Sequence, residues 1–232
     1  MSATGYATRP SPTLPRATTK QTCIHARWFW LLLWLAYPSV HAASSTAPPA
    51  PPSRPVIAGV CAGCHAAEGA GDASGIPRLA GMDADYLAHT LTAFKIGTRS
   101  SDTMQPIASA LSDTDISALA NYFAAQRPPP AHSQQLPAAT SVAGGNLIAL
   151  QGGSKGAPAC FSCHGTGGHG QGERYPRIAS EPATYIVNRL HEFQERARHG
   201  TPKSGSMTEV ASRLTDSEVR DVAAYLSMLP PE

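Results

Sequence analysis

The sequence has few charged residues, few aromatic residues and no long apolar run. Charged side chains make up 15% of its 232 residues, aromatic ones make up 6%, and the formal net charge is only +2. So small a positive excess, without a basic cluster, argues against a nucleic-acid-binding protein. The main apolar run, residues 28–37, is shorter than the roughly 20 residues that a transmembrane helix needs. Hydrophobic residues make up 42% of the whole sequence, which still suffices for globular cores.

The N-terminal residues have the pattern of a targeting segment. Basic residues precede the apolar run without any acidic one, and Val40-His41-Ala42 supplies small residues at the usual cleavage spacing. We interpret residues 1–42 as a secretory signal peptide and the protein as periplasmic, with an uncleaved membrane anchor as the alternative. Removal of residues 1–42 takes away four of the 18 basic residues and none of the 16 acidic ones, which leaves a formal charge of −2.

The rest of the chain is a tandem repeat. Residues 43–55 form a tether rich in Pro, Ala and Ser, and residues 128–142 form a linker, so the two copies span 56–127 and 143–232. The copies align first at an offset of 99 residues and, after an insertion, at 103. Capped amphipathic segments beginning near Ser112 and Thr215 predict helices, and no alternating strand pattern is present. The sequence thus predicts two small all-α domains.

Four of the five cysteines lie in two repeated motifs. Each motif is Cys-x-x-Cys followed directly by histidine, and the motif residues are Cys61, Cys64 and His65 in the first copy and Cys160, Cys163 and His164 in the second. This is the attachment pattern of covalent haem c, in which two thiols one helical turn apart bond the haem and the histidine binds its iron. Zinc would need both cysteine pairs in one shared cluster, and a redox dithiol would need a βαβ context. We therefore predict two haem c groups.

Further site residues follow from the repeat. Met104 and Met207 are repeat-equivalent and follow each histidine by about 40 residues, so we expect them to be the second axial ligands; packing methionines are the alternative. Pro77 and Pro176 are candidates to accept a hydrogen bond from each haem histidine. Arg78 and Arg177 are candidates to pair with haem propionates, unless they are merely solvated.

These motifs together resemble the two-domain, di-haem class I cytochromes c of the c-four type. The resemblance rests on the two haem motifs, the Pro-Arg-Leu-Ala-Gly and Pro-Arg-Ile-Ala segments, and the methionines with their following helices. It implies two tandem class I cytochrome c domains that each wrap one haem, with His65/Met104 and His164/Met207 ligation. The sequence departs from the family at Ala66, where glycine is usual, and at Ser180, where the first copy has Gly81.

The resemblance implies an electron carrier rather than an enzyme. We expect it to pass single electrons by outer-sphere transfer from a quinol-oxidising complex or a dehydrogenase towards a terminal oxidase. It would contact a membrane only by association or through an uncleaved anchor. One alternative is a cytochrome subunit of a periplasmic dehydrogenase complex. The other is a di-haem enzyme with an open axial position on the iron, although the paired methionines argue against it.

Overall fold

The computed structural model describes residues 55–130 and 137–231. The expected signal peptide at 1–42 and nearly all of the expected tether at 43–55 lie outside these residues. The described residues belong to a single compact unit of the chain. They are helical, and their only β feature is an isolated bridge between Gln171 and Tyr175, so the all-α expectation is confirmed. None of their helices is long and apolar enough to cross a membrane.

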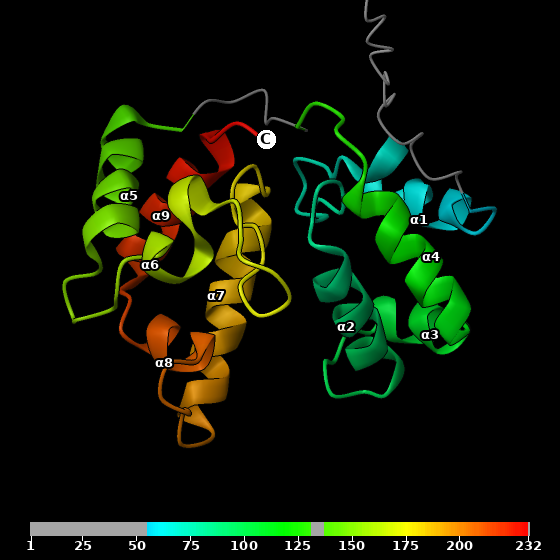
Figure 1. The fold of residues 1–232 in the computed structure, drawn as a ribbon. Helices are drawn as coiled ribbons and strands as arrows, with labels where there is room; N and C mark the ends of the chain where they lie inside the picture. Colours follow the sequence, from blue (N-terminus) through cyan, green and yellow to red (C-terminus); the bar gives the residue numbers. More distant parts are fainter. Residues whose placement is uncertain (1–54, 131–136, 232) are drawn as a thin grey trace, which may run out of the picture. The chain divides into compact units, whose positions relative to one another are not determined.

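The first half contains four α-helices (Figure 1), which are α1 (Ala58–His65), α2 (Ala84–Lys95), α3 (Met104–Ser109) and α4 (Asp113–Ala124). Ser112 caps α4 in a capping box with Asp115, at the helix start that the sequence placed near Ser112. Helix α2 contacts both α3 and α4. The first-half core lies between these helices and includes Leu87, Leu119 and Phe123.

The second half repeats this plan after an additional described helix. Its helices are α5 (Ala139–Gln151), α6 (Phe161–His164), α7 (Ala183–Arg198), α8 (Met207–Ser212) and α9 (Asp216–Met228). Helix α5 begins at Ala139, before the domain start expected at residue 143. Thr215 caps α9 in a second capping box, formed with Glu218.

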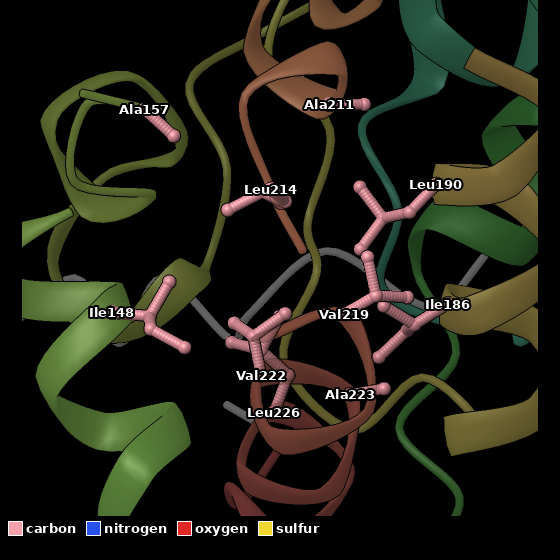
Figure 2. Packing of buried hydrophobic residues seen from close by; sticks show 10 residues of the cluster. All are labelled: Ile148, Ala157, Ile186, Leu190, Ala211, Leu214, Val219, Val222, Ala223 and Leu226. Carbon is pink, nitrogen blue, oxygen red and sulfur yellow. The ribbon is translucent and has the colours of Figure 1, made fainter. Parts of the chain in front are cut away.

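The second-half core is formed mainly by α7 and α9. Figure 2 shows Val219, Val222 and Leu226 of α9 together with Ile186 and Leu190 of α7. Helices α5 and α9 approach so closely that a Cβ atom on Gly145 would lie 2.1 Å from the backbone oxygen of Asp221. Only glycine permits this crossing, which fixes α5 beside the C-terminal helix (Figure 1).

Candidate haem-binding sites

Both motif histidines are buried and held in the same way. His65 ends α1 and His164 ends α6, and the two are only 7% and 6% exposed. The Nδ1 atom of His65 lies 2.9 Å from the carbonyl oxygen of Pro77, and that of His164 lies 2.7 Å from the carbonyl of Pro176. If Nδ1 donates to the carbonyl, Nε2 carries the lone pair that can bind iron.

Backbone hydrogen bonds tie each motif to the loop that carries its proline. In the first half, Gly71 N–H donates to the carbonyl of His65, and the Leu79 and Ala80 N–H groups donate to that of Gly69. The second half repeats these bonds, with Gly170 donating to His164 and with Ile178 and Ala179 donating to Gly168. The sequence repeat is therefore also a repeat of the loop geometry that orients each imidazole.

The electrostatics of the motif suit a covalent haem. Burial lowers the pKa of both His65 and His164, although the proline carbonyls oppose this effect. The lowered pKa favours the neutral imidazole, which is the form that binds a metal ion. Burial also raises the pKa of Cys61, and it raises the pKa of Cys160 to about 11. These cysteines are neutral thiols and not the reactive thiolates of a redox dithiol.

The donor set thus fits haem c. All four motif cysteines are free thiols, and in both halves each pair shares one helical turn with the buried histidine that follows it. Cys61, Cys64, Cys160 and Cys163 would hold the two haems covalently, and His65 and His164 would bind their iron. Once bound, each haem supplies a centre that gains and loses one electron.

The two candidate axial methionines occupy equivalent places. Met104 is the first residue of α3 and Met207 is the first residue of α8, and both side chains are partly buried. Met207 also packs against the second-half core. By contrast Met82, which lacks a methionine equivalent in the other copy, is buried in the first-half core.

The two candidate propionate-binding arginines are both almost fully buried. Arg78 is 1% exposed and Arg177 is 4% exposed. The Arg78 guanidinium donates to the backbone carbonyls of Ala80, Pro128 and Pro129, so it also joins its loop to the start of the linker. Burial lowers the pKa of Arg78, as does the nearby charge of Arg177, while Glu181 opposes both effects.

Three further residues near the sites were not identified from the sequence. The Tyr175 ring lies edge-on to His164, at 6.2 Å between centroids. Arg99 donates to the hydroxyl of Tyr185 at 3.2 Å, although its partner is 86 positions away and no local pattern pairs them. Glu181 is fully buried, and its only sequence signal was the mismatch with Met82 in the repeat.

Comparisons with known proteins agree with this geometry. The cytochrome c family profile matches residues 54–126 and again residues 152–230. A thiosulfate dehydrogenase electron acceptor of Thiomonas intermedia is 36% identical over 198 residues, which cover 84% of this chain and 90% of that protein.

Two solved structures are also similar. Cytochrome c4 of Acidithiobacillus ferrooxidans is 37% identical, with a TM-score of 0.63 over 73% of this chain and 98% of that one. The thiosulfate dehydrogenase of Marichromatium purpuratum is 39% identical, with a TM-score of 0.64 over 73% of this chain and 36% of that one. The chain therefore belongs to the cytochrome c family, as a tandem two-domain electron carrier that binds two covalent haem c groups in the manner of the cytochromes c4.

Proposed function

We propose that this protein is a periplasmic carrier that accepts electrons singly from a dehydrogenase and passes them on towards a terminal oxidase. The observation that carries this proposal is the repeated, buried histidine with its Nδ1 atom fixed by a proline carbonyl. A rigid ligand that stays in place suits outer-sphere transfer, because little reorganisation accompanies the electron. The signal-peptide pattern of residues 1–42 supports export.

The axial ligand pairs are His65 with Met104 and His164 with Met207. A thioether ligand favours the ferrous state and raises the reduction potential, as a carrier feeding an oxidase requires. Their equivalent positions at the starts of α3 and α8 support this assignment. Pro77 and Pro176 orient the histidines, and Arg78 and Arg177 pair with propionates through their buried guanidinium groups.

The ligand assignment is tested on the purified haem-loaded protein. We expect the weak far-red band of methionine-bound ferric haem to fall by half in Met104→Ala and in Met207→Ala, and to vanish in the double variant. Met228→Ala is the matched control, because Met228 is 41% exposed and aligns with Ala125. A wild-type protein that lacks half the band and binds cyanide readily would instead point to an open iron and an enzyme.

A dehydrogenase is the donor that the similar proteins favour. One relative is named as the electron acceptor of a thiosulfate dehydrogenase, and one similar structure is itself a thiosulfate dehydrogenase. A dehydrogenase releases two electrons per turnover, and two one-electron haems take one each. A permanent subunit of such a complex is the second candidate function.

The donor is tested by mixing oxidised protein with a thiosulfate dehydrogenase and thiosulfate, and following haem reduction by stopped flow. We expect both haems to be reduced within catalytic turnover, and a terminal oxidase then to reoxidise them. Co-elution with the dehydrogenase in gel filtration would indicate a permanent subunit, whereas separate elution with fast reduction would indicate a mobile carrier. Failure of any reduction would exclude this donor.

A further inference from the structure

Glu181 is a buried carboxyl group that the proposed function does not use. It lies in the loop between Arg177 and α7, and it is 2% exposed. Its Oε2 atom accepts a hydrogen bond from the backbone N–H of Arg78 at 3.1 Å, and Arg78 belongs to the first half. Its Oε1 atom is buried and has no hydrogen-bond partner among the described residues. An ionised carboxylate so placed costs more free energy than a protonated carboxylic acid does.

The fold does not require a carboxyl group at this position. The equivalent residue of the first copy is Met82, which is buried in an apolar core. Glutamate is rarely buried without a specific partner, because its charged form loses its hydration. The second copy therefore carries an ionisable group at a place where the first copy shows that a hydrophobic side chain fits.

The groups around Glu181 make its charge sensitive to nearby charges. Arg78 and Arg177 favour its ionised form, while burial outweighs them and raises the pKa of Glu181 to about 8. The charge of Glu181 also contributes to raising the pKa of Tyr185 on α7. Arg127, from the end of the first half, acts on Arg78. Arg78 and Arg177 are also the residues proposed to hold propionates, so Glu181 shares its cationic neighbours with the haem sites.

We propose that Glu181 is a proton-binding site coupled to electron transfer. Where Glu181 is ionised in the oxidised protein, uptake of one electron from the donor is accompanied by uptake of one proton from solvent, which converts the carboxylate into a carboxylic acid. When the electron leaves, the proton leaves with it. The reason is Coulombic, because an added electron places a negative charge in a low-dielectric interior, and protonation of a buried carboxylate in that interior offsets the charge. This inference rests on the haem-binding and electron-carrier role above.

The first test is a spectroelectrochemical titration of the haem-loaded protein between pH 6 and pH 10. At a fixed ambient potential, we expect the reduced fraction of at least one haem to fall several-fold as the pH rises through about 8. Glu181→Gln and Glu181→Met should remove this dependence, since neither side chain titrates. Glu173→Gln is the matched control, because the Glu173 side chain is 51% exposed, and it should behave as the wild type.

The second test detects the proton itself. Reduced-minus-oxidised infrared difference spectra near pH 8 should show the carbonyl stretch of a protonated carboxylic acid in the wild type and not in Glu181→Gln. A variant that keeps the full pH dependence and the band would overturn the proposal, as would a wild type without either. Loss of the far-red band or of electron uptake at pH 7 would instead contradict the carrier function, so the two failures are distinct.

Discussion

Lys95 and Gln194 occupy the same position of the repeat, but the two halves use it differently. Lys95 ends α2 and pairs with Asp113 at 2.9 Å, where the Asp113 side chain is 97% exposed. Gln194 is buried in α7, and its amide donates to the backbone carbonyls of Ala211 and Leu214 at 3.1 and 3.0 Å. The first half thus joins α2 to the start of α4 by a solvated ion pair, and the second joins α7 to α8 and to Leu214 by buried hydrogen bonds. Only the buried hydrogen bonds carry substantial free energy.

The position after the haem histidine shows a second contrast. Ala66 follows His65 with φ 61° and ψ 173°, and Gly165 follows His164 with φ 76° and ψ 167°. This region of backbone space is almost restricted to glycine. The loop geometry that orients the imidazole is therefore kept in the first half despite backbone strain, which means that the surrounding hydrogen bonds outweigh that strain.

The largest expected effect is at the contact between α5 and α9 in the second half. Gly145→Ala should lower the free energy of unfolding by about 2–3 kcal/mol, because the added methyl group would meet the Asp221 backbone. Urea unfolding followed by circular dichroism measures this change. Gly144→Ala is the control, because its methyl group would meet only side-chain atoms of Asp221, the nearest being a carboxyl oxygen at 3.0 Å. Equal losses in both variants would contradict the tight crossing.

The contrast between positions 95 and 194 is tested next. Gln194→Ala should cost about 2 kcal/mol of unfolding free energy, because two buried carbonyls lose a donor. Lys95→Ala should cost less than about 0.5 kcal/mol, because its ion pair is exposed. The same urea titration compares the two variants. A larger loss for Lys95→Ala would reverse the comparison.

Exchanges at Ala66 and at the equivalent Gly165 should change stability by a smaller amount and in opposite directions. Ala66→Gly should stabilise the protein by about 1 kcal/mol, and Gly165→Ala should destabilise it by a similar amount. Thermal unfolding of the haem-loaded variants measures both. Gly63→Ala, where an added methyl group meets nothing within 4 Å, controls for the general effect of removing a glycine. A destabilised Ala66→Gly would show that the loop is not strained.

The smallest effect concerns acid stability. Burial opposes the shift at Glu218, but hydrogen bonds from Ser154 and Thr215 lower its pKa to about 2. Because the folded-state pKa lies below that of the unfolded chain, this contribution is present above about pH 4.5 and is lost as the pH falls towards 2. Glu218→Gln should therefore cost less than about 1 kcal/mol at pH 7 and nothing near pH 2. Urea midpoints measured across this range would contradict the assignment if the difference stayed constant.

Sequence patterns alone indicate the haem motifs, the tandem repeat and several helix starts of this protein. The haem motifs and the capped helices after Ser112 and Thr215 depend on residues close in sequence, so local spacing alone indicates them, and comparison of the two copies indicates the repeat. The same spacing made Pro77 and Pro176 candidates for the carbonyl contacts that the structure places at 2.9 and 2.7 Å. Helix α5 begins at Ala139, within residues 128–142, which the sequence assigns to the linker by composition.

The contacts between residues far apart in sequence are visible only in the folded chain. It brought the backbone of Arg78 to the carboxyl of Glu181, 103 positions away, and Arg99 to the hydroxyl of Tyr185. No regular spacing in the sequence indicates such contacts, because they join segments that only folding brings together. The sequence shows a glutamate where the other copy has Met82, but the burial that makes this group a proton-binding candidate is a property of the folded chain.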